Sequence, residues 1–106
     1  MKELITKIDD ANFTELTSQG LVLVDFYADW CGPCRMLSPI LEALSNEMGD
    51  KLRIAKLDVD HASKTTASFQ ITSVPTMILF KNGKEVERIV GLKDLETLKK
   101  LVQHHS

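Results

Sequence analysis

The chain of 106 residues is 43% hydrophobic and 26% charged, a size and composition typical of one globular domain, residues 1–106, with a single core. A net charge of −2 offers no basic field for nucleic acid and no strong acidic field for a cationic partner. Charged residues interrupt the N-terminal decapeptide, and no stretch approaches the ~20 apolar residues that span a bilayer. We therefore expect a monomeric cytoplasmic protein without nucleic-acid or membrane partners.

The N-terminal residues predict a strand followed by a helix. Residues 3–8 alternate weakly between apolar and polar side chains, as in a short strand. Asp9 or Asp10 can cap a helix that directs Phe13 inward and ends before Gly20.

A buried strand and a long helix follow. Residues 21–27 form a nearly unbroken apolar run, which is typical of a strand covered on both faces in the middle of an α/β sheet; Asp25 is its exception. From Cys31 a helix is predicted to continue to Gly49, with Pro39 inside it. Its apolar face comprises Leu37, Ile40, Leu41, Leu44 and Met48.

The second half predicts three strands and two helices. Residues 52–59 read as a strand that contains Lys56, and residues 61–69 as a weaker helix. Residues 76–80 and 85–90 flank an Asn-Gly pair, the strongest short signal for a β-hairpin, so these strands are antiparallel neighbours. An amphipathic helix extends from residue 92 to the end. This order of elements predicts an α/β sandwich of helices around a mixed sheet.

The only two cysteines lie at the junction of the apolar strand and the long helix. On a first helical turn, residues three apart share one face with Cβ atoms roughly 5–6 Å apart, so Cys31 and Cys34 can open and close a disulfide. Cys31 is exposed to the unpaired N–H groups of the helix, which favour its thiolate, and it is the expected nucleophile. Cys34 lies one turn in, where a covered thiol serves as the resolving cysteine.

The spacer and the histidines favour redox chemistry over metal binding. Gly32 leaves room for an incoming protein, and Pro33 stiffens the first turn. The alternative is half of a zinc site, but His61, His104 and His105 are the only other candidate ligands of the type that structural zinc sites use, and none has a recognised spacing from the cysteines. We therefore expect no metal.

Residues 30–34, Trp-Cys-Gly-Pro-Cys, resemble the active-site motif of the thioredoxin family. The resemblance extends over essentially the whole chain and implies an α/β thioredoxin fold, a five-stranded mixed sheet in the order 1-3-2-4-5 with two helices on each face. Tyr27 departs from the family pattern, because many thioredoxins have a second tryptophan there. The further matching segments are Val24-Asp25-Phe26, Arg35, Lys56-Leu57-Asp58, Val74-Pro75-Thr76, Phe80-Lys81-Asn82-Gly83 and Gly91.

The resemblance implies roles for two charged residues. Asp25 would accept the proton of Cys34, directly or through a water, with Lys56 nearby in the adjacent strand. The alternative for Asp25 is a structural acid satisfied by a local hydrogen bond or ion pair, since such pairs also perturb carboxylates.

The resemblance also implies a docking surface for substrate. Pro75 would be cis and face the cysteines, and Val74 would offer its backbone to a substrate strand, with Trp30, Gly91 and Gly83 around the patch. Alternatively, Pro75 is an ordinary residue at a strand's start, Trp30 fills the core, and the glycines serve only turns.

The function implied is protein-disulfide reduction by dithiol–disulfide exchange, without an organic cofactor. Electrons would pass from NADPH through thioredoxin reductase to disulfide-containing protein substrates. One alternative is an oxidant or isomerase, although such relatives usually carry a histidine in the spacer. Another is a binding module in which the cysteines are incidental.

Overall fold

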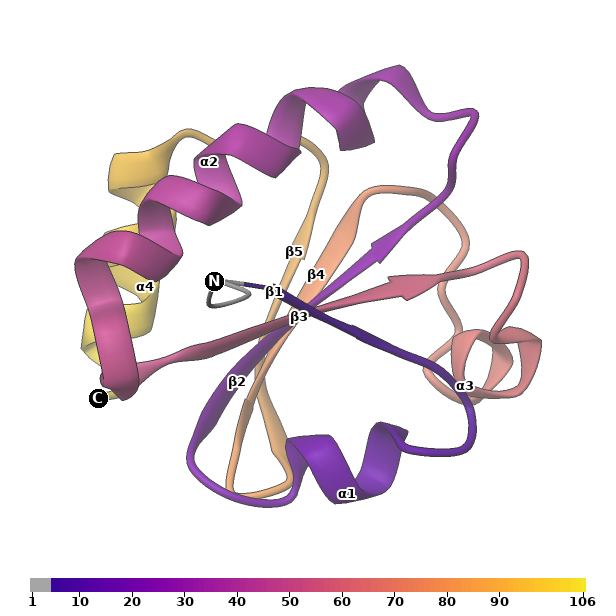
Figure 1. Ribbon diagram of the computed structural model, residues 1–106, viewed down its shortest axis with the longest axis horizontal. Coiled ribbons are helices and arrows are strands. Elements are labelled where there is room, and N and C mark those ends of the chain that lie inside the picture. Colours follow the sequence, from indigo (N-terminus) through magenta and orange to yellow (C-terminus); the bar gives the residue numbers. More distant parts are fainter. Residues whose placement is uncertain (1–4) are drawn as a thin grey trace.

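The computed structural model describes residues 5–106 and contains a five-stranded sheet in the order β1-β3-β2-β4-β5 (Figure 1). The strand order expected from the resemblance is confirmed. The elements are β1 (Ile5–Ile8), α1 (Phe13–Thr17), β2 (Leu21–Tyr27), α2 (Gly32–Met48), the short 3-10 helix η1 (Gly49–Lys51), β3 (Arg53–Asp58), α3 (Ser63–Ser68), β4 (Thr76–Lys81), β5 (Lys84–Val90) and α4 (Leu95–His104).

The sheet is mixed, with β2 at its centre. β3 is parallel to both β1 and β2, whereas β4 is antiparallel to β2 and β5. Asn82 and Gly83 both have positive φ, 51° and 86°, as the predicted tight hairpin requires. The apolar run that forms β2 therefore has a hydrogen-bonded neighbour on each side, as predicted.

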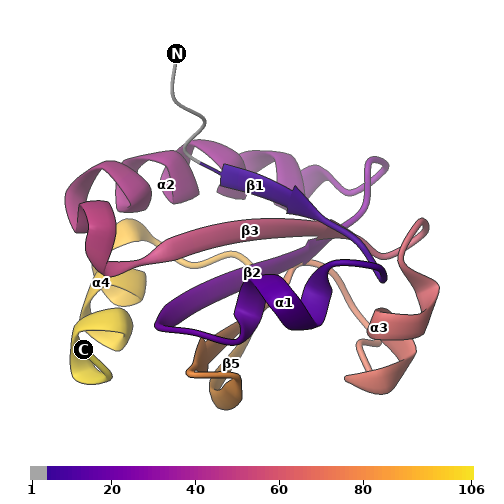
Figure 2. The ribbon, with the colours of Figure 1, turned by 60° about the horizontal axis from the view of Figure 1, so that its bottom comes forward.

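Helices cover both faces of the sheet in two pairs. Figure 2 shows α1 and α3 below the sheet and α2 above it, and α2 and α4 contribute to the same apolar cluster. Because successive side chains of a strand point to opposite faces, Leu23 joins the cluster under α2 and α4, whereas Val24 and Phe26 join the one that contains Phe13 of α1. The C-terminal end of β2 leads through residues 28–31 into the start of α2.

Several element boundaries differ from the prediction. α1 begins at Phe13, so neither Asp9 nor Asp10 is its N-cap. The carboxylate of Asp10 instead accepts the backbone N–H groups of Lys64 and Thr65, at 3.2 and 2.8 Å, where α3 begins. A local pattern cannot reveal this use, because the partners are more than fifty positions away.

The start of the C-terminal helix also differs from the prediction. α4 begins at Leu95, later than predicted, because Asp94 caps it by accepting the N–H of Thr97 at 2.9 Å. Residues 3 and 4 of the predicted first strand lie outside the described residues. Within residues 5–106, no helix has the length and apolar character needed to cross a bilayer.

Candidate functional site

The two cysteines form a disulfide at the N-terminus of α2. Cys31 is the N-cap, with an extended backbone, and Cys34 lies in the first turn, 5.3 Å away between Cα atoms. The prediction that both lie within the helix is therefore wrong by one residue at Cys31. The N-cap position places the Cys31 sulfur among the N–H groups that no helical carbonyl accepts.

Electrostatic surroundings distinguish the two sulfurs. The backbone N–H of Cys34 donates to Sγ of Cys31 at 3.2 Å, and the carbonyl oxygen of Val74 lies 3.7 Å from the same sulfur. An N–H donor at a helix N-terminus stabilises a thiolate. Exposure does not distinguish them, because Cys31 and Cys34 are only 4% and 3% exposed in this oxidised form. The expected contrast in exposure is thus absent from the disulfide state.

Asp25 is fully buried in β2 behind this helix. Neither carboxylate oxygen has a hydrogen-bond partner among the described residues. Burial raises the pKa of Asp25 from 3.8 to about 7, and the nearby positive charge of Lys56 offsets only part of that rise. The local hydrogen bond or ion pair of the structural alternative is not found, and the group is able to exchange a proton near neutral pH.

Lys56 lies beside Asp25 in the neighbouring strand but is held by other groups. The two residues are paired in the register of β2 and β3. The ammonium group of Lys56 donates to the hydroxyl of Ser38 at 3.4 Å and lies 4.4 Å from the centre of the Tyr27 ring. Within residues 5–106 it forms no ion pair with Asp25. The charge of Lys56 therefore lowers the pKa of Asp25 without a direct contact between the two groups.

A small cavity connects the inner cysteine with this lysine. Its volume is about 110 Å³, which is enough for water because a water molecule occupies about 30 Å³. It leaves space for water beside Cys34, although Asp25 is not among the residues that line it. Its lining residues are Tyr27, Ala28, Asp29, Cys34, Arg35, Ser38 and Lys56.

The Val74-Pro75 peptide is cis, as expected, and packs against the cysteines. Val74 contacts the apolar cluster that contains both of them. Gly91, which follows β5 with a φ of 94°, donates its N–H to the carbonyl of Pro75 at 2.8 Å. This hydrogen bond joins Gly91 to Pro75, whose neighbour Val74 packs against the disulfide.

Trp30 is not a core residue, since 69% of it is exposed. Its indole N–H donates to the carboxylate of Asp60 at 3.0 Å, which holds the ring at the edge of a shallow groove of about 130 Å³. The groove is lined by Trp30, Val59, Thr66, Ile71, Thr72, Ser73 and Val74.

Gly83 does not belong to this surface, contrary to expectation. It lies in the β4–β5 hairpin, where a side chain would meet the backbone of Ser18, whereas Pro75 precedes the opposite end of β4. Because β4 is six residues long, about 20 Å separate the two positions. Asn-Gly therefore serves the turn alone.

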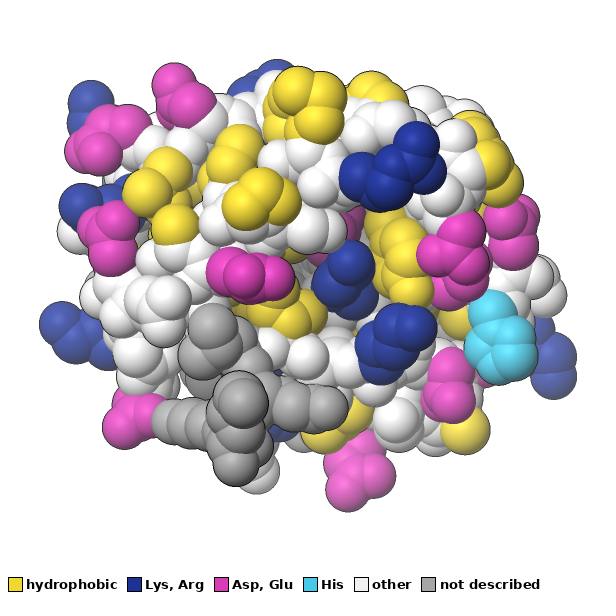
Figure 3. Space-filling model, turned by 45° about the horizontal axis from the view of Figure 1, so that its top comes forward, with side chains coloured by type: hydrophobic (Ala, Val, Ile, Leu, Met, Phe, Trp, Pro, Cys, Tyr) yellow, Lys and Arg dark blue, Asp and Glu magenta, His cyan; other side chains and the backbone are white. Residues whose placement is uncertain are grey.

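The structure shows exposed apolar side chains that the sequence analysis did not identify. A hydrophobic pattern identifies buried faces, so exposed apolar side chains escape it. Figure 3 shows hydrophobic side chains interspersed with charged ones on the face that carries α2. The large exposed hydrophobic residues besides Trp30 are Met36, Val90 and Leu92. Within residues 5–106, no group of three histidine, cysteine or acidic side chains could hold a metal ion.

A disulfide at the N-terminus of a helix that follows the central strand of a mixed sheet is typical of a thiol–disulfide oxidoreductase. The chain belongs to the thioredoxin family, whose model matches residues 4–104. It is 48% identical to thioredoxin of Bacillus subtilis over 95% of this chain and 97% of that protein. It is 50% identical to thioredoxin of Chlamydia muridarum, over 96% and 99%.

The fold comparison agrees with the sequence comparison. A mutant thioredoxin from Halobacterium salinarum superposes with a TM-score of 0.87 at 38% identity, covering 94% of this chain and 88% of that one. The protein is therefore an oxidoreductase that acts by dithiol–disulfide exchange through Cys31 and Cys34.

Proposed function

We propose that the protein reduces disulfides in other proteins, with Cys31 as the nucleophile. The Cys31 thiolate attacks one sulfur of the substrate disulfide, forms a mixed disulfide and releases the other sulfur as a thiolate. Cys34 then attacks the Cys31 sulfur, closes the internal disulfide and releases the second substrate thiolate. Two electrons pass to the substrate. The N–H of Cys34 directed at the Cys31 sulfur is the observation that supports this assignment most strongly.

We assign proton transfer during resolution to Asp25. Cys34 must lose its proton before it attacks, and a base is most effective when its pKa lies near the working pH. Burial raises the pKa of Asp25 to about 7, and the cavity beside Cys34 has room for a water that carries the proton. When Asp25 gives up the proton again, the positive charge of Lys56 stabilises its carboxylate.

We assign substrate docking to the surface around the disulfide. An extended substrate segment pairs with the backbone of Val74 and lies between Trp30 and Gly91. Support comes from the groove along residues 71–74 and from the open space at Gly32, where an added Cβ would meet no atom within 4 Å. Pro33 is exposed beside it and keeps the approach rigid.

The wider setting follows from the same chemistry. The oxidised protein needs two electrons, which we propose come from NADPH through thioredoxin reductase, with no bound cofactor in this chain. We place the protein in the cytoplasm, as a monomer of one domain, because a reducing compartment suits a catalytic Cys-x-x-Cys pair. The Gly-Pro spacer lacks the histidine that favours the oxidant or isomerase alternative.

The test is reduction of insulin disulfides with dithiothreitol as electron donor. The unaltered protein should accelerate precipitation of the reduced insulin chains. Cys31→Ser should not exceed the rate with dithiothreitol alone, and protein whose two thiols have been alkylated serves as the matched control. A Cys31→Ser variant with full activity would exclude the proposed nucleophile. An inactive parent would favour the binding-module alternative instead.

A further inference from the structure

One wall of the docking groove is held at both ends by groups from β5 and its continuation. Residues 71–74 form this wall. At its C-terminal end, the N–H of Gly91 donates to the carbonyl of Pro75 at 2.8 Å. At its N-terminal end, Nη1 of Arg88 donates to the carbonyl of Phe69 at 2.8 Å. The residues on either side of this wall are therefore both hydrogen-bonded, one to the edge strand β5 and the other to Gly91 directly after it.

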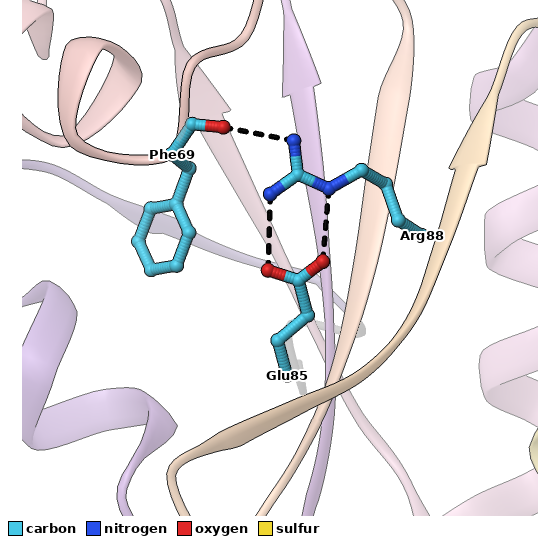
Figure 4. A network of polar contacts seen from close by, with 3 residues as sticks. All are labelled: Phe69, Glu85 and Arg88. Carbon is cyan, nitrogen blue, oxygen red and sulfur yellow. Dashed lines mark hydrogen bonds and ion pairs between the residues drawn. The ribbon is translucent and has the colours of Figure 1, made fainter.

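The guanidinium of Arg88 is itself fixed in orientation. Its Nε and Nη2 atoms donate to the two carboxylate oxygens of Glu85, at 2.9 and 3.0 Å (Figure 4). This bidentate pair sets the plane of the guanidinium, because the donors of arginine have a rigid fork geometry. The remaining Nη1 donor is thereby directed at Phe69, as Figure 4 shows.

The Phe69 carbonyl that accepts this bond precedes a turn with a left-handed residue. After α3, the N–H groups of Gln70 and Ile71 return to the carbonyls of Ala67 and Thr66, at 3.0 and 3.1 Å, in the pattern of a Schellman motif. Gln70 has a φ of 54°, a conformation that glycine adopts freely and other residues disfavour. The turn that precedes residues 71–74 is thus supported by its own two hydrogen bonds and, from outside its segment, by the bond of Arg88 to Phe69.

Aromatic packing is the competing source of that support. The ring of Phe69 lies 5.3 Å from that of Phe13, 6.3 Å from that of Phe26 and 5.5 Å from that of Phe80. These contacts fix the side chain, and the Gln70 N–H bond to Ala67 holds one side of the peptide group that follows Phe69. The bond from Arg88 acts on that peptide group directly.

We propose that Arg88 is a positioning residue for substrate docking, which holds the Phe69 carbonyl and so fixes the groove wall at residues 71–74. The inference rests on the function proposed above, since it assumes that a disulfide-containing protein docks on this wall. The side chains of Arg88 and Glu85 are each 34% exposed, and exposed pairs contribute little to global stability. The effect of Arg88 is therefore local to the wall.

The test compares a protein substrate with a small one. Arg88→Met should raise the KM for insulin by about three- to tenfold, the effect of one lost hydrogen bond, and leave kcat unchanged. Reaction with a small aromatic disulfide, which does not reach the wall, should keep its rate. Arg53→Met is the matched control, because Arg53 is exposed at the end of β3 remote from the cysteines.

Two further measurements separate positioning from general stability. Hydrogen exchange of the Gln70 and Ile71 amides should accelerate in Arg88→Met, while the midpoint of unfolding stays close to that of the parent. Adding Gln70→Gly should restore part of the KM, because glycine adopts the required turn without the clamp. Arg88→Lys should recover only part of it, because lysine lacks the fork that sets the direction of the donor.

The outcomes distinguish this inference from the function beneath it. Unchanged exchange at residues 70–71 in Arg88→Met overturns the clamp, and equal losses on insulin and the small disulfide overturn its docking role. A parent protein that does not reduce insulin overturns the proposed function, and with it the docking role, even if exchange shows that the clamp exists.

Discussion

Replacement of Cys34 with serine is expected to stop turnover and leave substrate proteins covalently attached to Cys31. The resolving attack is intramolecular, and well-oriented groups reach effective molarities of about 10⁵–10⁸ M. An external thiol at about 1 mM cannot replace that concentration, so release should slow by at least about a thousandfold. Non-reducing electrophoresis followed by mass spectrometry of the linked peptides measures the adduct.

The matched variant is Cys31→Ser, which keeps one thiol in the same apolar cluster. It should accumulate no adduct, because Cys34 lies inside the first turn and lacks the N-cap position, whose sulfur receives a backbone N–H. Excess dithiothreitol should release the Cys34→Ser adducts as intact substrate. Adducts that form equally well in both variants would contradict the assignment of nucleophile and resolving thiol.

Replacement of Asp25 with asparagine is expected to stabilise the fold, and more so at pH 8 than at pH 4. Below pH 3.8 the carboxyl is neutral in both the folded and unfolded states. Between pH 3.8 and about 7, only the folded state keeps the proton, so the free energy of unfolding falls as the pH rises and then levels off. At 1.36 kcal/mol per unit, this cost reaches about 4 kcal/mol.

Denaturant unfolding of the parent and of Asp25→Asn at pH 4 and pH 8 measures this difference. The gain at pH 8 should exceed the gain at pH 4 by about 4 kcal/mol, the linkage free energy of the raised pKa. Asp50→Asn is the control, because Asp50 is exposed in η1 and its replacement should change stability little at either pH. A loss of stability at pH 8 would make Asp25 a structural acid.

The same substitution should slow insulin reduction at neutral pH. Asparagine cannot accept the proton of Cys34, so resolution loses its base, and general bases typically contribute 10²–10⁴-fold. The deficit should shrink as the pH rises, because Cys34 then ionises without help. Full turnover by Asp25→Asn at pH 7 would exclude the role in proton transfer.

The parts of the fold that sequence reasoning predicted are those with strong local signals. The apolar run of β2 predicted the central strand because burial on both faces removes the polar alternation. Asn82-Gly83 predicted the hairpin because its residues tolerate positive φ. The spacing of Cys31 and Cys34 predicted the disulfide site, because residues three apart on a first helical turn share one face.

The features that the sequence did not predict depend on contacts between distant segments. Asp10 caps α3 rather than α1, and Arg88 binds the carbonyl of Phe69, although nothing near either residue in the sequence indicates its partner. Gly83 was placed at the docking surface because glycine alone does not reveal which end of a strand it serves. No local pattern indicates that Lys56 pairs with Asp25 in the register of β2 and β3; only the resemblance implied that the two lie close together.

The central claim, that Cys31 and Cys34 pass two electrons to a protein disulfide, is tested most directly by a single turnover without added reductant. Fully reduced protein is mixed anaerobically with an equimolar single-disulfide protein, quenched with an alkylating reagent and analysed by mass spectrometry. Each substrate disulfide that is reduced should yield two substrate thiols and one Cys31–Cys34 disulfide. Substrate thiols that appear while Cys31 and Cys34 remain reduced, or a substrate that stays oxidised, would contradict it.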